Sequence, residues 1–161
     1  WAHNSHIGNA AATAMGWAGE FNVGELCRAA YDNDSVLIGF GTDRGTVAAA
    51  SAWGQPMEIK TVRAAREDSY EYAFRKTGLA RSLTNWRASS KRALVDALSE
   101  PMLERAIGVV YRPESELTSH YFEAVLAEQF DAYVWFEETH AVTPLAVGGK
   151  TGAPETYPFG L

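Results

Sequence analysis

The residues best suited to chemistry in this sequence are two histidines close to its start, in the segment WAHNSHIG. An imidazole exchanges a proton near neutral pH, so histidine is the commonest general acid or base in enzymes. His3 and His6 are separated only by Asn4 and Ser5. We expect His3 and His6 to be catalytic and Asn4 to bind the substrate.

The same pair of histidines leaves a metal site open as an alternative. A zinc ion needs three or four ligands, and this spacing supplies two, without an HExxH motif. The chain itself therefore predicts neither a metal site nor a cofactor. A metal-dependent hydrolase would need further ligands from outside this chain. Ser5 is a poor candidate for a nucleophile because no GxSxG motif surrounds it.

A second group of reactive residues lies in GVVYRPESELTSHYF, from residue 108 to residue 122. Arg112 follows an apolar run that predicts a central strand, and its guanidinium suits an anionic or carbonyl oxygen. His120 and Tyr121 are expected at the N-terminus of a helix, where backbone N–H groups favour oxyanions. We therefore expect Arg112, His120 and Tyr121 to bind the substrate.

The elements that must position these residues alternate between strands and helices. One strand is predicted to end near His3. Apolar runs and alternating patterns predict further strands over 35–41, 46–51, 56–63, 106–111 and 131–139. The GTDRG segment is expected to join 35–41 to 46–51 as a hairpin. Helical spacing and capping residues predict helices at 22–31, 69–78, 91–98 and 120–130.

This alternation predicts an α/β fold with a mostly parallel sheet and helices on its faces. Ligands bind at the carboxyl ends of parallel strands in such sheets. The loops HNSHIG, FGTDRG and YRPESE each follow an expected strand. We therefore expect these three loops to converge on one site.

Composition narrows the range of partners. The chain has 161 residues, 47% of them hydrophobic, and a net charge of -6, so a nucleic acid or an acidic membrane surface is not an expected partner. The single cysteine, Cys27, excludes an internal disulfide and fits a reducing, cytoplasmic location. The expected partner is a small-molecule ester.

Five blocks of this sequence, taken together, resemble the erythromycin esterase family. They are WAHNSHIG, GELCRAAY, VLIGFGTDRGTVAAAS, GVVYRPESELTSHYF and QFDAYVWFEET, in this order. The resemblance implies a metal-independent hydrolase that opens macrolide lactones or cleaves other esters, with a histidine that activates water. It places His3 and His6 as the family's second histidine pair, which positions substrate or water.

The resemblance covers only the C-terminal portion of a family member. It implies that residues 1–145 are the C-terminal part of a larger hydrolase domain, followed by an irregular Pro- and Gly-rich tail over 146–161. The general base and its glutamates would then lie in the N-terminal half of the same protein, which becomes an expected partner. A family member that binds a ligand without catalysis is the remaining alternative.

Overall fold

The computed structural model describes residues 2–87 and 92–143. In this part of the chain, four strands form one sheet, namely β1 (Ile38–Ala49), β2 (Glu58–Val62), β3 (Arg81–Asn85) and β6 (Ala132–Thr139). A smaller sheet pairs β4 (Met102–Arg105) with β5 (Tyr121–Ala124). Seven α-helices accompany these strands within the described ranges, namely α1 (Asn4–Ile7), α2 (Ala14–Trp17), α3 (Val23–Tyr31), α4 (Tyr70–Lys76), α5 (Arg92–Leu98), α6 (Glu116–Ser119) and α7 (Leu126–Gln129).

The larger sheet has the strand order β2-β1-β6-β3. The mixed α/β class is confirmed, but the expectation of a mostly parallel sheet is wrong. Only β1 and β6 pair in parallel, whereas β2 and β3 join the sheet antiparallel, and so does β4 with β5. The connection between β1 and β2 is too short for the crossover that a parallel pair needs, so these two strands form an antiparallel pair.

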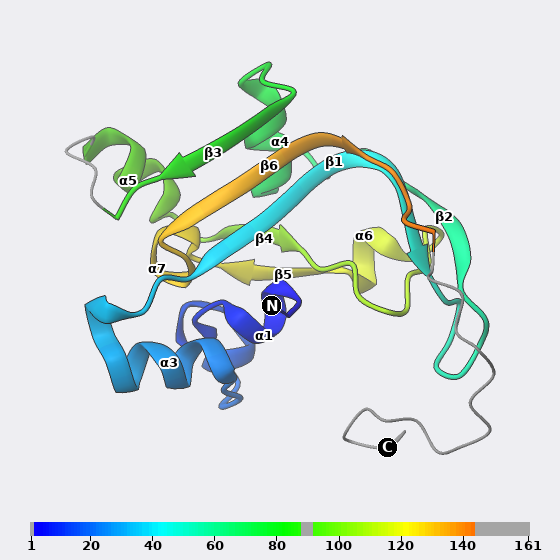
Figure 1. Cartoon of the computed structure of the whole chain (residues 1–161). Helices are drawn as coiled ribbons and strands as arrows, with labels where there is room; N and C mark the ends of the chain where they lie inside the picture. The colour runs from blue at the N-terminus through cyan, green and yellow to red at the C-terminus, as the bar shows by residue number, and fades with distance from the viewer. Residues whose placement is uncertain (1, 88–91, 144–161) are drawn as a thin grey trace.

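β1 is one continuous strand where the sequence predicts a hairpin. Gly45 pairs with Thr139 of β6 and with Val62 of β2, so the strand passes from one neighbour to the other. Its φ of 120° is open to glycine alone, and a Cβ there would lie 2.0 Å from the Thr139 carbonyl oxygen. The strand therefore bends at Gly45 instead of turning back, and β1 and β6 arch together (Figure 1).

Two other predicted elements have a different structure. The predicted helix over 120–130 begins as strand β5, because pairing with β4 outweighs the helical spacing, and only its last part is the short helix α7. The predicted central strand over 106–111 is a connecting segment that touches the end of β1 through a single bridge. There Ala50 N–H donates to the Val109 carbonyl at 2.8 Å, and Tyr111 N–H to the Ala50 carbonyl at 3.0 Å.

The remaining predicted helices and strands are confirmed, apart from the first residues. α3 begins where Asn22 Oδ1 accepts the Glu25 N–H at 2.9 Å, and α4 begins where Ser69 Oγ accepts the Tyr72 N–H at 3.3 Å. Residues 2 and 3 are not part of a strand, and the segment after them forms α1. The predicted tail over 146–161 lies outside the described residues.

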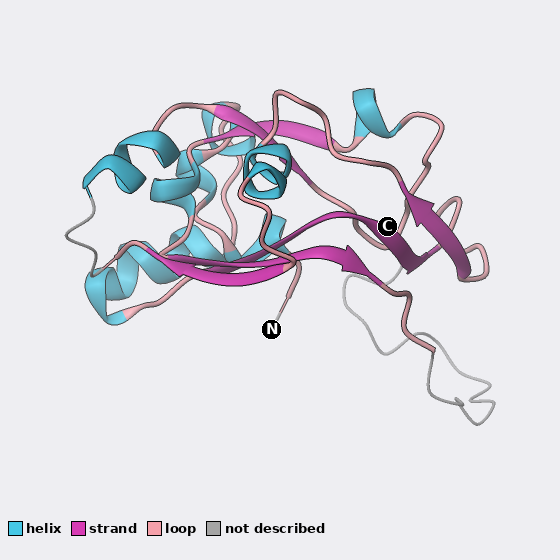
Figure 2. Ribbon diagram, turned by 90° about the horizontal axis from the view of Figure 1, so that it is seen from above, coloured by secondary structure: helices cyan, strands magenta, loops and turns pink. Residues whose placement is uncertain are grey.

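The core lies between the larger sheet and the helices and small sheet packed against it. Figures 1 and 2 show the two sheets as separate layers, with most helices gathered at one end. The buried core side chains come from several of these elements, and they include Tyr70, Phe74, Leu126, Phe130, Tyr133 and Trp135. Among the described helices, none has the length and hydropathy needed to cross a bilayer.

Candidate functional site

A pocket of about 600 Å³ opens beside β1. This volume falls within the range of small-molecule sites. Its walls are largely apolar, and they include Phe40, Val47, Val62, Ile107, Phe136 and Val142. Polar and charged side chains also line it, and among them are His3, Asn4, Glu71, Arg105 and His140. Such a pocket suits an apolar ligand with a few polar groups.

His3 is a neutral imidazole in a fixed orientation. Its Nδ1 accepts the Ser5 backbone N–H at 3.2 Å, so Nε2 carries the proton and donates to the Ile107 carbonyl at 2.9 Å. Burial lowers the pKa of His3 more than the bond to Ile107 raises it, and nearby His6 lowers it further. The side chain predicted to be catalytic thus lines the pocket, with both ring nitrogens engaged.

His6 lies beside His3 but does not line this pocket. The two ring centroids are 6.4 Å apart in an edge-on arrangement. The His6 side chain is exposed and makes no hydrogen bond to any residue that the structure describes. The structure therefore brings the two predicted histidines together and directs only His3 to the pocket.

Asn4 joins α1 to the unpaired edge of β1. Its Nδ2 donates to the Phe40 carbonyl at 2.7 Å, and its Oδ1 accepts the Phe40 N–H at 3.1 Å, as a neighbouring strand would. Nδ2 also donates to Glu104 Oε1 at 3.2 Å. The Asn4 amide therefore positions the segment that carries His3, and its expected contact with substrate stays a prediction.

Two buried glutamates, of which Glu71 lines the pocket, were not singled out from the sequence. Glu71 on α4 and Glu104 on β4 are 1% and 0% exposed. Glu71 Oε1 accepts the Arg105 backbone N–H at 3.0 Å, whereas the Oε2 atom of each glutamate has no hydrogen-bond partner in the described chain. The only sequence signal was the position of Glu71 between Tyr70 and Tyr72, in the first turn of a predicted helix.

Both glutamates are protonated more readily than usual. Burial raises the pKa of Glu104 to about 8, and the charge of Glu71 adds to this effect, while Gln129 and Asn4 oppose it. Burial also raises the pKa of Glu71, and Arg105 opposes that shift. Perturbed carboxyl groups beside a pocket are typical of functional sites.

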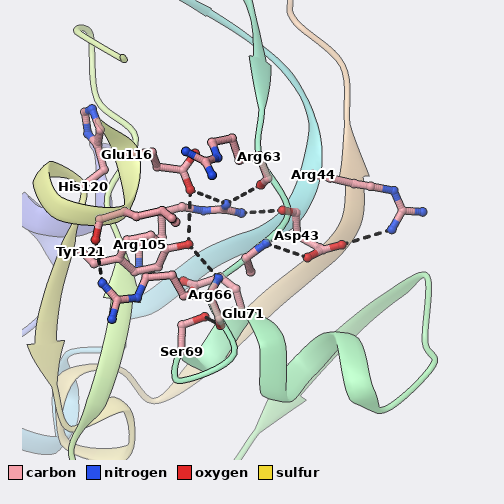
Figure 3. Close-up of polar contacts among 12 residues, drawn as sticks. Asp43, Arg44, Arg63, Arg66, Ser69, Glu71, Arg105, Glu116, His120 and Tyr121 are labelled. Atoms are coloured by element: carbon pink, nitrogen blue, oxygen red, sulfur yellow. Dashed lines mark hydrogen bonds and ion pairs between the residues drawn. The ribbon is translucent and has the colours of Figure 1, made fainter. Parts of the chain in front are cut away.

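Arg105, which lines the pocket, ties three chain segments together (Figure 3). One terminal nitrogen donates to the Arg63 carbonyl at 2.8 Å and to Glu116 Oε1 at 3.1 Å. The other donates to the carbonyls of Thr42 and Asp43. Because both terminal nitrogens are engaged, Arg105 holds the scaffold and has little capacity left to bind an anion.

The second predicted group of residues lies apart from the pocket lining. Arg112 is exposed, and its Nε donates to the Ser51 carbonyl at 2.9 Å. His120 Nε2 accepts the Arg112 N–H at 3.3 Å, and its Nδ1 donates to the Ala106 carbonyl at 3.1 Å. The His120 ring thus holds the loop after β4. Neither Arg112 nor His120 lines the pocket that His3 lines.

Tyr121 belongs to the buried network around Glu116. Its hydroxyl donates to Glu116 Oε1 at 3.3 Å and accepts the Arg66 N–H at 3.2 Å. His120 follows α6 and Tyr121 begins β5, so the predicted helix N-terminus for an oxyanion does not exist at this position. The substrate contacts expected of Arg112, His120 and Tyr121 stay predictions. None of the three lines the pocket, although Tyr121 packs against Arg105, which does.

Metal ligands are not grouped in the part of the chain that the structure describes. Over residues 2–87 and 92–143, no three His, Cys, Asp or Glu side chains come together in a way that could hold an ion. The metal-dependent alternative relied on ligands from outside this chain, so this arrangement leaves it untested.

Comparison with known proteins assigns the chain to a protein family. A sequence profile of the erythromycin esterase family matches residues 1–139. The chain belongs to the erythromycin esterase family. The resemblance drawn from its five sequence blocks is thereby confirmed.

Two solved structures show the same fold in longer proteins, and a third solved protein aligns less closely. A succinoglycan biosynthesis protein aligns with a TM-score of 0.68 and 22% identity, over 87% of this chain and 32% of its own. A Bacillus cereus protein aligns with a TM-score of 0.70 and 17% identity, over 87% of this chain and 33% of its own. An erythromycin esterase EreC mutant in its open conformation aligns with a TM-score of 0.40 and 20% identity, over 84% and 30%. This family member spans about a third of the length of these proteins.

Proposed function

We propose that this chain is the C-terminal portion of an ester or lactone hydrolase whose substrate binds in the pocket beside β1. The observation that carries the proposal is the pocket itself, in which apolar walls surround a neutral His3 and a buried Glu71. Apolar walls suit the hydrocarbon part of an ester, and the polar groups suit its carbonyl. Membership of the erythromycin esterase family supports the same reaction class.

In this proposal, water attacks the carbonyl carbon of the ester and loses its proton to a histidine. His3 and His6 position substrate or water, and the general base is supplied by the N-terminal half of the protein. The Nε2–H of His3 becomes a hydrogen-bond donor to the carbonyl oxygen once the segment around Ile107 moves away. No metal or cofactor takes part, and the protein acts in the cytoplasm on macrolide-like or other esters.

The proposal is tested by His3→Asn and His6→Asn in the full-length protein. General acid–base or positioning groups contribute ~10²–10⁴-fold to a rate, so each variant should lower kcat/KM for an ester by at least ~10²-fold. Glu123→Gln, an exposed change on β5, is the control. Wild-type turnover by both histidine variants would refute this assignment.

A binding role without catalysis is the second candidate, because both ring nitrogens of His3 are engaged within the protein. A protein of this kind would bind an ester in the pocket and leave it intact. Calorimetric titration with an uncleaved ester, beside a product assay on the same sample, separates the two functions. Binding with no product would favour the binding role.

A further inference from the structure

We propose that Glu71 and Glu104 share one proton, and that Glu71 delivers it as a general acid to the leaving oxygen of an ester bound in the pocket. The pair would be a catalytic group of this portion of the chain, separate from the histidine that activates water. This inference rests on the proposed hydrolytic function.

Of the two glutamates, Glu71 lies nearer the proposed substrate site, so it is the one that donates the proton. Glu71 lines the pocket, whereas Glu104 lies behind it and is held by Asn4. Each carboxyl group uses one oxygen in a hydrogen bond and leaves its Oε2 buried without a partner in the described residues. A buried carboxylate oxygen without a partner is costly, and a proton on one of the two groups removes much of that cost.

Arg105 supplies the positive charge that faces the pair, and it lowers the pKa of Glu71 by less than burial raises it. Arg105 lies closest, but one of its terminal nitrogens is already paired with Glu116 and the other with carbonyl groups. Three tyrosines with uncharged hydroxyls also face the pair, namely Tyr70, Tyr121 and Tyr133, and the neutral His3 lines the same pocket as Glu71. Two like charges in a buried site cannot both ionise near neutral pH, and the pair titrates as a unit.

The electrostatics agree with this distribution of charge. Burial and the neighbouring carboxylate raise the pKa of Glu104 to about 8, so a proton remains on the pair at pH 7. Burial together with both glutamates raises the pKa of the Tyr133 hydroxyl as well. Tyr133 therefore stays protonated beside the pair.

The proposed step is balanced in atoms and charge. Water adds to the ester carbonyl, and its proton passes to the general base of the N-terminal half. The tetrahedral intermediate then collapses, the bond from carbon to the leaving oxygen breaks, and that oxygen takes the proton from the Glu71 carboxyl group. The proton held by the general base then returns to the Glu71–Glu104 pair through water. The net reaction converts ester and water into acid and alcohol.

The test compares two esters that differ in their need for an acid. Ethyl butyrate has a poor leaving group and needs protonation, whereas the nitrophenolate of p-nitrophenyl butyrate leaves without it. In the full-length protein, Glu71→Gln should lower kcat/KM for ethyl butyrate by ~10²-fold or more. For p-nitrophenyl butyrate, the expected loss is less than ~10-fold. Glu123→Gln serves as the matched control, and equal losses for both esters would overturn the acid role.

The second variant tests the coupling between the two carboxyl groups. Glu104→Gln removes the neighbouring charge, so the alkaline limb of the ethyl butyrate pH–rate profile should move to lower pH. An unmoved limb would overturn the coupling. A structural defect would lower the rate without moving the limb.

Infrared spectroscopy detects the shared proton directly and needs no substrate. The wild-type protein at pH 7 should show a protonated-carboxyl C=O band that is missing from the Glu71→Gln/Glu104→Gln double variant. Absence of this band in the wild type overturns the pair itself. If the wild type cleaves neither ester, the proposed hydrolysis fails on these substrates, and the infrared band still decides whether the proton is shared.

Discussion

Arg105 shows how one buried charge holds together the chain segments around the pocket. It is 6% exposed, and its terminal nitrogens reach Glu116 and three backbone carbonyls from two other segments. Arg105→Met would leave Glu116 buried without its cation, so we expect a loss of about 3 to 5 kcal/mol in the free energy of unfolding. Urea unfolding measures this loss. Arg112→Met, at an exposed arginine, should cost less than about 1 kcal/mol, and equal losses would contradict this role.

The buried Glu104 predicts how stability depends on pH. The unfolded chain releases this proton near the ordinary pKa of 4.5, and the folded chain releases it near about 8. Between these values the folded chain binds more protons, so the free energy of unfolding contributed by Glu104 falls as the pH rises. Glu104→Gln should flatten this decline in urea unfolding between pH 5 and pH 8, as compared with Glu123→Gln. An unchanged slope would show that Glu104 is ionised throughout.

At the scale of single residues, the sequence predicts part of the candidate site. His3 was predicted because an imidazole in a loop-like segment is conspicuous, and it lies at the pocket. Glu71 and Glu104 escaped notice, because acidic residues near a helix start or in a short strand are usually exposed. Their burial depends on segments far apart in the chain, and no local pattern records that.

Among the elements, β1 depends most on one backbone position. Gly45 has a φ of 120°, and a Cβ there would lie 2.0 Å from a backbone oxygen of β6. We expect Gly45→Ala to lower the free energy of unfolding by about 2 kcal/mol or more, because strain and a clash combine. Gly54→Ala is the control, since Gly54 has a φ of 76° and open space around it, so only about 1 kcal/mol is expected. Thermal unfolding of both variants compares them, and equal losses would remove the clash from the explanation.

The sequence predicted elements well where local signals agree with the packing. α3 and α4 have capping residues and helical spacing, and β6 has an apolar run, so their patterns were sufficient. β5 was predicted as a helix, because its spacing fits one and its pairing with β4 is a tertiary event. The bend in β1 was predicted as a hairpin loop, since glycine marks both turns and close approaches of two strands.

At the scale of the whole molecule, one face of the larger sheet is apolar and open. Along β1, β3 and β6, exposed apolar side chains alternate with side chains of the buried face. The exposed ones are Ile38, Phe40, Leu83 and Phe136, and they are 39% to 68% exposed. Solved proteins with this fold are about three times longer. We therefore expect this chain on its own to self-associate through the open face unless the N-terminal half accompanies it.

Sedimentation of the isolated chain tests this expectation. Leu83→Lys should reduce self-association, because it places a charge in the open face. Trp53→Lys is the matched control, since Trp53 is 83% exposed and lies in the loop between β1 and β2, outside the strands that form the open face. A monomeric wild-type chain that unfolds cooperatively would contradict the prediction.

Hydrogen exchange in the presence of a bound ester analogue tests most directly whether the pocket beside β1 is the active site. A trifluoromethyl ketone hydrate imitates the tetrahedral intermediate and can be added to the full-length protein without turnover. We predict slower exchange in β1 and in residues 139–142, which line the pocket around His3. Protection confined to the segment from Arg112 to His120, which does not line the pocket, would place the substrate there and contradict the proposed site.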